Sequence, residues 1–401
     1  YFWSINCYFR HTFCDFITNI SKIFGASTAL PGRNNATSWF SFNRLAHMAY
    51  PTVVMEMTVS REVIQIDSRW NIAELQHHLS DALSGTGPAL STSQLNESQI
   101  DSKVALVVAT SGSTGNPKNV ALSAASLLTN ARATHSFLQA SPGDRWSLLL
   151  PTEHIAGLNV LIRSIELGTH PCGVENKADF TAIVPTQLFR ALNGEAKLLS
   201  HLQGCKAVLV GGGPLSSKLR IDAQEKGIRI HESYGMTESC GGVIYDGYPL
   251  DGVSVSIING RVALKGKQLA IGYLEVPLPL ENGWFLTQDL GELDNGKLRI
   301  LGRVDDQIIS GGEKISLSAV EDFLQSEFST DQIVAFAQQS NEWGEQLCIA
   351  TTADLSLERV SPLLKAKFGE HVAPKKLLKI SKIPYLSIGK PDRKKLANDN
   401  A

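Results

Sequence analysis

TSGSTGNPK, residues 110–118, directly follows the apolar run VALVVA at 104–109. A short apolar run that is rich in β-branched residues and ends in turn residues predicts a buried strand. The nine residues after it supply hydroxyl groups, glycines and one lysine. Hydroxyl donors and exposed backbone N–H groups can surround an anion, so this stretch is typical of a phosphate-binding loop. A flexible connection between strands has a similar composition, and the loop alone does not separate these alternatives.

Two common loop motifs are excluded by spacing. A Walker P-loop needs a glycine immediately before its lysine, and here Pro117 precedes Lys118. A nucleophile elbow needs a glycine two positions before its serine, and here Ser111 precedes Ser113 at that spacing. What remains is a strand-to-loop turn that has the parts of a phosphate cradle, with the cation of Lys118 behind it, and a flexible connection stays open as the alternative.

From about residue 50, short apolar strands alternate with longer helical segments. Further strands are predicted at WSLLL (146–150), FTAIVP (180–185), KAVLVGGG (206–213) and IRIHESYG (228–235). Ser123 is a candidate N-cap for a helix through LLTNARATHSFL, and a second helix through IAGLNVLIRSIELG is expected to stop at Gly168. Alternation of this kind predicts parallel crossover units with ligands at the carboxyl ends of the strands.

The pattern changes after about residue 250, where short strands and glycine turns such as VSVSIING and GKLRILGR replace it. The last hundred residues contain EKISLSAVEDFLQ, a long helix candidate, and a basic tail. We therefore predict an α/β protein with a large N-terminal domain over 50–302, in which helices flank mainly parallel sheets. A small, mobile α+β domain follows over 303–401.

Composition limits the class of protein. The 401 residues are 43% hydrophobic and 19% charged, with a formal net charge of −2, as in a soluble globular protein. A net charge this close to zero does not predict binding to nucleic acid or to an anionic membrane. No apolar run is long enough to predict membrane insertion. The six cysteines are scattered without a CxxC pair, which argues against a disulfide framework and a zinc site and predicts a cytoplasmic location.

The first 49 residues differ from the rest. They are dense in aromatic side chains, and they lack the basic n-region and unbroken apolar core of a secretory signal. We expect an appended or disordered segment here, and it does not enter the functional argument.

Residues 110–118 resemble the phosphate-binding signature of the adenylate-forming superfamily, which includes acyl-CoA synthetases, nonribosomal peptide adenylation domains and firefly luciferase. The other signatures of the superfamily have counterparts in the same order: YGMTE (234–238), WFLTQDLG (284–291), LGRVDDQIISGGEKI (301–315) and IPYLSIGKPDRKKL (383–396). Two departures are Asn119, where a glycine is usual after the lysine, and Gln288, where a glycine commonly precedes the aspartate. Asn tolerates left-handed backbone angles, so the first departure weakens the resemblance little.

The resemblance implies ATP, Mg²⁺ and coenzyme A as small-molecule partners, and it assigns nucleotide-binding roles. The phosphates would be held by Thr110, Ser111, Gly112, Ser113, Thr114, Gly115 and Lys118. Thr237 would contact the α-phosphate, and Glu238 would help to hold Mg²⁺. Tyr234 would stack on adenine beside Gly211, Gly212 and Gly213, which admit the adenosine because they lack side chains. Asp289, assisted by Arg303, would accept hydrogen bonds from the ribose hydroxyls.

The C-terminal signatures imply a second set of roles. Lys390 would bridge the acyl carboxylate and the α-phosphate during adenylation. Asp305 would be the hinge about which the small domain rotates between the two half-reactions. After that rotation, Gly311 and Gly312 would admit the pantetheine arm of coenzyme A.

LPTEHIAGLNVLIRS, VPTQLFRAL and YGMTESCGGVIYDG further resemble the o-succinylbenzoyl-CoA synthetases, a family of menaquinone biosynthesis. This implies a ligase that adenylates o-succinylbenzoate, an aromatic carboxylic acid, releases pyrophosphate and transfers the acyl group to coenzyme A. His154 would gate the acyl pocket, to which Gly235 would also contribute, and Arg163 or Arg190 would accommodate the second carboxylate. An alternative for both arginines is an ordinary helix-surface position.

Three alternatives stay open. The chain could be another aryl- or acyl-CoA synthetase, an adenylation module that loads a carrier protein, or a binding relative without activity. The last is disfavoured because Lys390, Glu238 and Asp289 are all present. The oligomeric state is also left open, with a homodimer among the alternatives.

Overall fold

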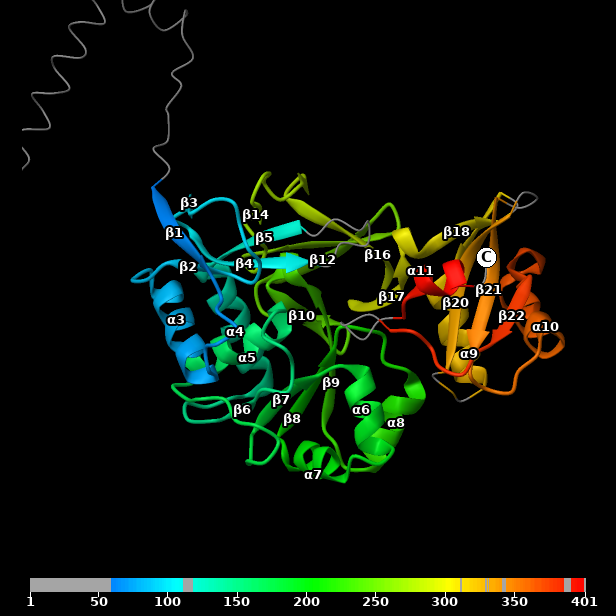
Figure 1. Ribbon diagram of the computed structural model, residues 1–401, viewed down its shortest axis with the longest axis horizontal. Coiled ribbons are helices and arrows are strands. Elements are labelled where there is room, and N and C mark those ends of the chain that lie inside the picture. The colour runs from blue at the N-terminus through cyan, green and yellow to red at the C-terminus, as the bar shows by residue number, and fades with distance from the viewer. Residues whose placement is uncertain are drawn as a thin grey trace, which may run out of the picture. The chain divides into compact units, whose positions relative to one another are not determined.

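The computed structural model describes residues 59–110, 118–310, 312–328, 330, 332–340, 344–385 and 391–399. Within these ranges the chain is a mixed α/β protein, in agreement with the predicted class (Figure 1).

The predicted strand before the phosphate loop lies in a mixed sheet. In spatial order this sheet contains β14 (Gly272–Tyr273), β5 (Lys118–Ser123), β4 (Val104–Thr110), β2 (Ala89–Ser91), β1 (Ser60–Gln65) and β3 (Gln99–Asp101). Strand β4 is parallel to β2 and antiparallel to β5, so Thr110 and Lys118 face each other across β4 and β5. The two ends of the loop are therefore held together by the sheet.

The second sheet supplies the parallel strands that the sequence predicts. Its order is β11 (Tyr248–Pro249), β10 (Gly241–Tyr245), β9 (Ile230–Met236), β8 (Ala207–Gly211), β7 (Phe180–Ile183) and β6 (Trp146–Ser147). Strands β6 to β9 pair in parallel, whereas β10 and β11 are antiparallel additions. The carboxyl ends of β8 and β9 therefore open at the same edge of this sheet.

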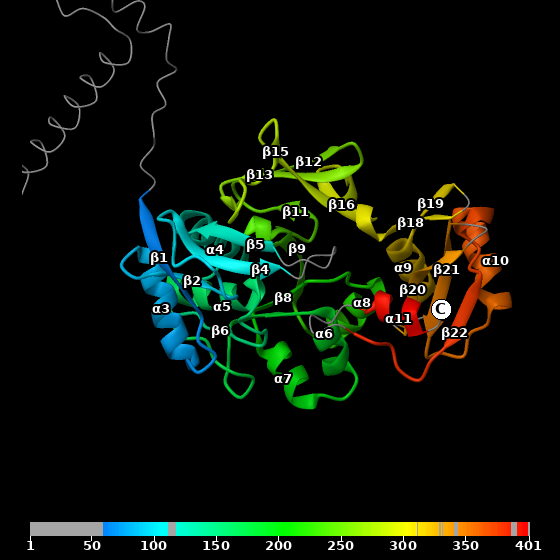
Figure 2. The same cartoon turned by 45° about the horizontal axis from the view of Figure 1, so that its top comes forward.

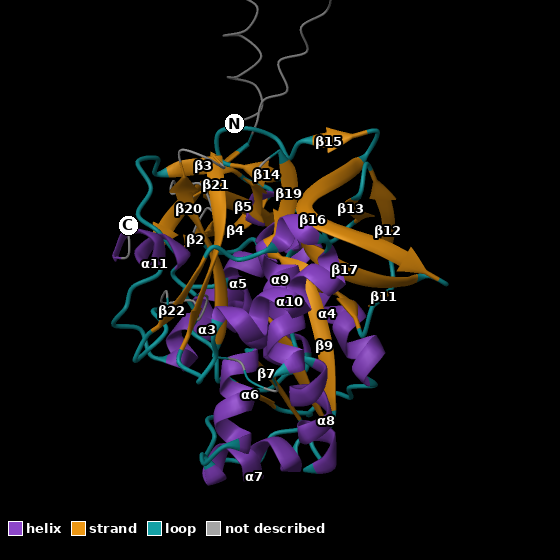
Figure 3. Ribbon diagram, turned by 90° about the vertical axis from the view of Figure 1, so that its right-hand side faces the viewer, coloured by secondary structure: helices purple, strands orange, loops and turns teal. Residues whose placement is uncertain are grey.

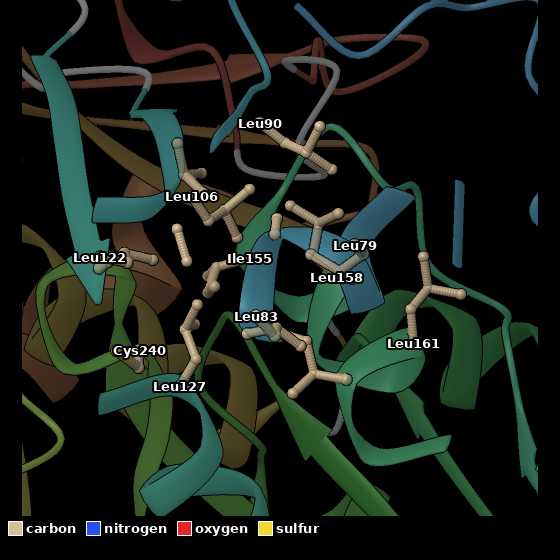
Figure 4. Packing of buried hydrophobic residues seen from close by; sticks show 14 of the residues in the cluster. Leu79, Leu83, Leu90, Leu106, Leu122, Leu127, Ile155, Leu158, Leu161 and Cys240 are labelled. Atoms are coloured by element: carbon tan, nitrogen blue, oxygen red, sulfur yellow. The ribbon is translucent and has the colours of Figure 1, made fainter. Parts of the chain in front are cut away.

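One layer of helices packs between these two sheets. It contains α3 (Ile72–Ser84), α4 (Ala124–Leu138) and α5 (Ile155–Glu166). Leu79 and Leu83 of α3, Leu127 of α4 and Leu158 of α5 pack with Leu106 of β4 in one core (Figure 4). The opposite sides of α4 and α5 pack on the second sheet through a core that includes Trp146, Phe180 and Tyr245.

The other face of the second sheet is covered by α6 (Pro185–Leu192), α7 (Ala196–Gly204) and α8 (Ser217–Glu225), which lie together beside β7 and β9 (Figure 3). The third sheet is antiparallel and is visible in Figure 2. It contains β12 (Val253–Ile258), β13 (Arg261–Gly266), β16 (Trp284–Asp294), β15 (Leu280–Glu281) and β17 (Lys297–Arg303).

The chain after β17 forms a separate sheet with its own helices. The strands are β18 (Gln307–Ser310), β19 (Glu313–Ser316), β20 (Ile333–Ser340), β21 (Gly344–Thr351) and β22 (Lys376–Lys379). The helices are α9 (Leu317–Glu327), α10 (Leu357–Phe368) and α11 (Arg393–Asp399), with short 3₁₀ turns η2 (Val304–Asp306) and η3 (Glu370–Val372). Their core clusters draw only on residues from Ile308 onward.

Two element predictions need correction. The run WSLLL was expected to be a strand over 146–150, but only Trp146 and Ser147 are in β6, because the chain leaves the sheet where Leu149 O accepts a hydrogen bond from Gln187 Nε2 at 2.8 Å. EKISLSAVEDFLQ was interpreted as one helix candidate. Its first four residues instead form β19, and Ser316 caps α9 by accepting a hydrogen bond from Ala319 N at 3.3 Å.

An ion-pair network joins η2 to the end of the chain. Arg393 Nη1 lies 2.6 Å from Asp306 Oδ1, and Arg393 Nη2 lies 2.7 Å from Glu321 Oε2. The carboxylates of Asp306 and Glu321 are both buried. Breaking such a pair leaves a buried charge without its partner, so the network fixes α11 against η2 and α9.

No helix among the described segments has the length and apolar character that crossing a membrane requires.

Candidate active site

The ends of the predicted phosphate loop are the first part of the site. Thr110 Oγ1 donates a hydrogen bond to Lys118 O at 3.3 Å, and these two residues pair across β4 and β5. Residues 111–117, which include most of the predicted phosphate ligands, lie outside the described residues. Asn119 continues β5 and accepts a hydrogen bond from Ser93 Oγ at 2.9 Å. Its backbone is extended, so the left-handed tolerance of asparagine is not used here.

The second part is a 3₁₀ turn, η1 (Thr237–Ser239), which begins where β9 ends. It places Thr237 and Glu238 at the carboxyl edge of the parallel strands, as predicted for ligand-binding side chains. The turn is held from two sides. Ser239 Oγ donates a hydrogen bond to Gly241 O at 2.8 Å, and Asn159 Nδ2 of α5 donates one to Cys240 O at 2.8 Å. Asn159 was missed by the sequence analysis, because an amide inside an amphipathic helix carries no signal of its long-range partner.

Tyr273 connects the first two parts. Its hydroxyl donates a hydrogen bond to Glu238 Oε1 at 3.0 Å, and the ammonium of Lys118 lies 4.9 Å from the centroid of its ring. Glu238 O also accepts a hydrogen bond from Ala270 N at 2.8 Å. The predicted phosphate-binding lysine and the predicted magnesium-binding carboxylate are thus brought to the same aromatic ring.

The residues near Glu238 fit a magnesium ion that arrives with a nucleotide. Within the described ranges, no three His, Cys, Asp or Glu side chains group closely enough to hold a metal ion on their own. Mg²⁺ is typically bound through one or two carboxylates together with phosphate oxygens and water. The single carboxylate of Glu238 matches that pattern, with the cation of Lys118 on the other side of the Tyr273 ring to attract the phosphates.

The third part joins three residues that the sequence assigned to the adenosine. Tyr234 Oη of β9 donates a hydrogen bond to Asp289 Oδ2 at 2.7 Å, and Arg303 Nη1 lies 3.2 Å from Asp289 Oδ1. Asp289 is buried, and its backbone N–H donates to Thr287 Oγ1 at 3.1 Å. Burial and then the neighbouring Asp289 charge raise the pKa of Tyr234, so the hydroxyl stays protonated as a donor.

The three positions at the end of β8 differ in why they hold glycine. A Cβ on Gly211 would lie 2.8 Å from Ser233 O, and Gly212 has a φ of +78°. Close packing and backbone conformation therefore require glycine at these two positions. A Cβ on Gly213 would meet nothing closer than Pro185 Cγ at 3.9 Å, so this backbone is open to a ligand.

Gly235 is also explained by packing. An added Cβ would lie 2.0 Å from Gly241 O of the adjacent strand β10, so the β9–β10 pairing excludes any side chain. Gly312 has a φ of +88° and no atom within 4 Å of an added Cβ. Its glycine is required by the turn between β18 and β19, and the predicted contact with coenzyme A stays a prediction.

His154 lies at the N-cap position of α5 and is half-buried. The helix starts tightly here, because a Cβ on Gly157 would lie 2.1 Å from Pro151 O. An added Cβ on Gly241 would lie 3.9 Å from Ile155 Cγ1, so the start of α5 borders the chain just after η1. His154 therefore lies next to the helix residue that borders this segment, and its role as a gate stays a prediction.

The two candidate arginines have different surroundings. Arg163 is not a helix-surface residue: it is 3% exposed, and its guanidinium lies 5.0 Å from the Trp146 ring. Its Nη2 lies 3.3 Å from Tyr245 Oη and 3.4 Å from Thr134 Oγ1. Burial lowers the pKa of Arg163. None of these contacts is with a residue predicted for the substrate.

Arg190 is exposed on α6, and its Nε lies 3.4 Å from Glu195 Oε1. It borders a cavity of about 390 Å³. The cavity is lined by Leu149, Val174, Gln187, Arg190, Glu195, Ala196, Lys197 and Leu198. Because an exposed ion pair is weak, Arg190 can exchange Glu195 for another carboxylate at little cost.

His135 lies beside Arg163 in the same helix layer and gives a test of this packing. Burial and then the Arg163 charge lower the pKa of His135 to about 4. Because the pKa is about 6.5 in an unfolded chain, unfolding takes up a proton between these values. The contribution of a neutral His135 to stability is present above pH 6.5 and is lost as the pH falls towards 4.

We expect the free energy of unfolding of His135→Gln to fall less than that of the wild type when the pH is lowered. The proton uptake by His135 on unfolding accounts for a loss of at most about 1.4 kcal/mol per pH unit. Urea unfolding of both proteins at pH 7 and pH 5 measures the difference. His77→Gln is the control, because His77 is largely exposed. Equal acid sensitivity in all three proteins would show that folding does not lower the pKa of His135.

Lys390 and Gly311 lie outside the described residues, and of Asp305 only the backbone is described, within η2. Their predicted roles in adenylation, coenzyme A access and domain rotation therefore stay predictions.

Comparison with known proteins agrees with this geometry. The AMP-binding enzyme family matches residues 51–273. A probable 2-succinylbenzoate–CoA ligase of Mycobacterium tuberculosis is 36% identical over 325 residues, which are 74% of this chain and 84% of the relative. The 2-succinylbenzoate–CoA ligase of Escherichia coli is 31% identical over 286 residues, 66% of this chain and 62% of that protein.

A solved structure has the same fold. The o-succinylbenzoate CoA synthetase (MenE) from Bacillus subtilis, in complex with the acyl-adenylate intermediate OSB-AMP, aligns with a TM-score of 0.64 at 25% identity. The alignment covers 84% of this chain and 78% of that one. The chain therefore belongs to the AMP-binding enzyme family, and within it to the 2-succinylbenzoate–CoA ligases.

Proposed function

We propose that this chain adenylates o-succinylbenzoate with ATP and transfers the acyl group to coenzyme A, in menaquinone biosynthesis. The observation that carries the proposal is the convergence of two sets of side chains at the carboxyl edge of the parallel strands. Tyr234, Asp289 and Arg303 form one set, and Lys118, Tyr273 and Glu238 form the other. The relatives named above act on this acid, and a cytoplasmic location remains our prediction.

The chemistry explains why both sets are needed. A carboxylate does not react with a thiol at neutral pH, because its oxygen is a poor leaving group. Attack of the carboxylate on the α-phosphorus of ATP forms an acyl-adenylate and releases pyrophosphate. The thiol of coenzyme A then attacks the acyl carbon, and AMP leaves. The first step requires neutralisation of phosphate charge more than it requires a base.

In the proposed first step, Lys118 and residues 110–115 hold the β- and γ-phosphates, and Thr237 contacts the α-phosphate. Glu238 holds Mg²⁺, which when bound neutralises phosphate charge. Tyr234 orients the adenine, and Asp289 accepts hydrogen bonds from the ribose. Lys390 contacts both reacting partners, the carboxylate and the α-phosphate.

The acid is proposed to lie beyond His154, at the N-terminal end of α5. Of the two arginine candidates for its second carboxylate, we favour Arg190. Arg163 is enclosed by Thr134, Trp146 and Tyr245. Arg190 is exposed, and its side-chain partner among the described residues is Glu195 in a weak surface pair.

A screen of carboxylic acids with ATP and coenzyme A tests the proposal. Pyrophosphate and thioester are measured separately for o-succinylbenzoate, benzoate, malonate and a medium-chain fatty acid. We expect o-succinylbenzoate to give both products with the highest kcat/KM. Higher kcat/KM with another acid would identify a different synthetase, and pyrophosphate without thioester until a phosphopantetheine carrier protein is added would identify a carrier-loading module.

The ribose assignment gives a prediction for ATP binding. Asp289→Asn should raise the KM for ATP about tenfold, because hydrogen bonds to a charged acceptor are stronger than those to a neutral amide. The KM for the acid should stay unchanged. Asp294→Asn is the control, since Asp294 is exposed at the end of the same strand. If the KM for ATP is unchanged in Asp289→Asn, Asp289 does not bind the nucleotide.

A further inference from the structure

Strand pairing places the ring of Tyr273 beside Lys118. Tyr273 pairs with Val120 of β5, and Lys118 is two residues before Val120. Residues at this spacing lie on one face of a strand, so the ammonium and the ring meet on the same face of the sheet. The resulting distance of 4.9 Å from Nζ to the ring centroid is within the range of a cation–π contact.

The backbone around Tyr273 is fixed on three sides. Ile271 N donates to Ala121 O at 3.0 Å, Leu274 N to Asn119 O at 3.0 Å, and Tyr273 N to Val276 O at 2.8 Å. A Cβ on Gly272 would lie 2.6 Å from Val276 O, so the turn is too tight for any side chain there. The backbone position of Tyr273 is therefore set by main-chain contacts and does not depend on its two side-chain partners.

Lys118 and Glu238, both of which are described, form no ion pair with each other. They contact the face and the hydroxyl of the same tyrosine instead. A direct ion pair would neutralise both groups and would have to be broken before either could bind a ligand. With the ring between them, the cation remains available for a phosphate and Glu238 keeps a second carboxylate oxygen for a metal ion.

We infer that Tyr273 is a positioning residue that holds Lys118 and Glu238 apart and orients the Glu238 carboxylate for Mg²⁺. This inference rests on the proposed roles of Lys118 and Glu238 in binding Mg²⁺ and ATP. Two separable effects follow. The hydroxyl acts through Glu238 on the magnesium requirement, and the ring acts through Lys118 on nucleotide binding without magnesium.

Calorimetric titration of ATP into the enzyme, without acid or coenzyme A, tests this at graded Mg²⁺ concentrations. Tyr273→Phe removes the hydroxyl and keeps the ring. It should raise the Mg²⁺ concentration for half-maximal tightening of ATP binding about tenfold, which is the loss expected for one hydrogen bond to a charged acceptor. Its magnesium-free ATP affinity and its melting temperature should equal those of the wild type. Tyr273→Leu, which also removes the ring, should weaken magnesium-free binding as well.

Two further variants separate the possible failures. Tyr248→Phe is the control, because Tyr248 is 51% exposed and should behave as the wild type. Glu238→Gln should shift the magnesium requirement at least as far as Tyr273→Phe. If Glu238→Gln shifts the requirement and Tyr273→Phe does not, the role of Tyr273 is wrong. If Glu238→Gln has no effect either, the proposed magnesium role of Glu238 is wrong. If Tyr273→Phe has a lower melting temperature and loses ATP affinity equally with and without Mg²⁺, Tyr273 has only a structural role.

Discussion

Lys390→Ala should lower the rate of pyrophosphate release at least 100-fold, while thioester formation from supplied acyl-adenylate stays largely intact. The reason is that the proposed contact of Lys390 exists only while the carboxylate attacks the α-phosphate. Losing a charge-assisted contact to a transition state of this kind costs about 3 kcal/mol, which corresponds to about two orders of magnitude in rate. Stopped-flow measurement of each half-reaction gives both rates.

Lys394→Ala is the matched control, because Lys394 is an exposed lysine of the same basic segment. It should leave both half-reactions unchanged. Arg393, between the two lysines' positions, is fixed by its ion pairs with Asp306 and Glu321 and is therefore unsuitable as a control. Equal losses in both half-reactions of Lys390→Ala would contradict its catalytic assignment and indicate a structural role.

Asp305→Pro should spare adenylation and slow thioester formation by more than tenfold. One site must serve two reactions, and Lys390 would obstruct the thiol in the second, so the small domain is proposed to rotate about Asp305. The residue after it cannot take up the rotation easily, since Asp306 is bound to Arg393 at 2.6 Å and accepts a hydrogen bond from Ser318 N at 3.1 Å. Proline's φ near −65° suits the 3₁₀ turn η2 but prevents a large change in φ.

Asp305→Ala separates the backbone effect from loss of the carboxylate and should retain both half-reactions. The melting temperature of the proline variant should be compared with that of the alanine variant, so that a folding defect is recognised. If Asp305→Pro forms the thioester at the wild-type rate, Asp305 is not the hinge.

The sequence predicted the parts of the fold that local patterns determine. The run at 104–109 is a buried strand because its β-branched residues match a fully covered position in a sheet, and Ser123 caps α4 with a hydrogen bond from Ser126 N at 3.0 Å. The run at 146–150 was predicted too long, because a tertiary contact from Gln187 and not local composition ends that strand. EKIS became a strand because it pairs with β18, which no local pattern of those four residues reveals.

The site was predicted unevenly for the same reason. Tyr234 and Asp289 were recognised from ordered motifs, but their 2.7 Å contact joins residues that are 55 positions apart in the chain and lie in two different sheets. Tyr273 escaped notice because its neighbours give no charge or spacing signal. It matters only through β14, a two-residue strand that joins the sheet of the phosphate loop from more than 140 positions away in the chain.

The hairpin of β16 and β17 has a consequence for allostery. In this hairpin Arg303 pairs with Asp289, and Arg303 is the residue immediately before η2. The carboxylate proposed to bind the ribose therefore belongs to the same hydrogen-bonded unit as Arg303, which lies two residues before the proposed hinge at Asp305. Coupling free energies are reciprocal, so a nucleotide that favours one orientation of the small domain is bound more tightly, by the same factor, in that orientation. We therefore expect that, if the proposed rotation leads to the orientation that binds the nucleotide more weakly, AMP leaves more readily from that orientation once the thioester has formed.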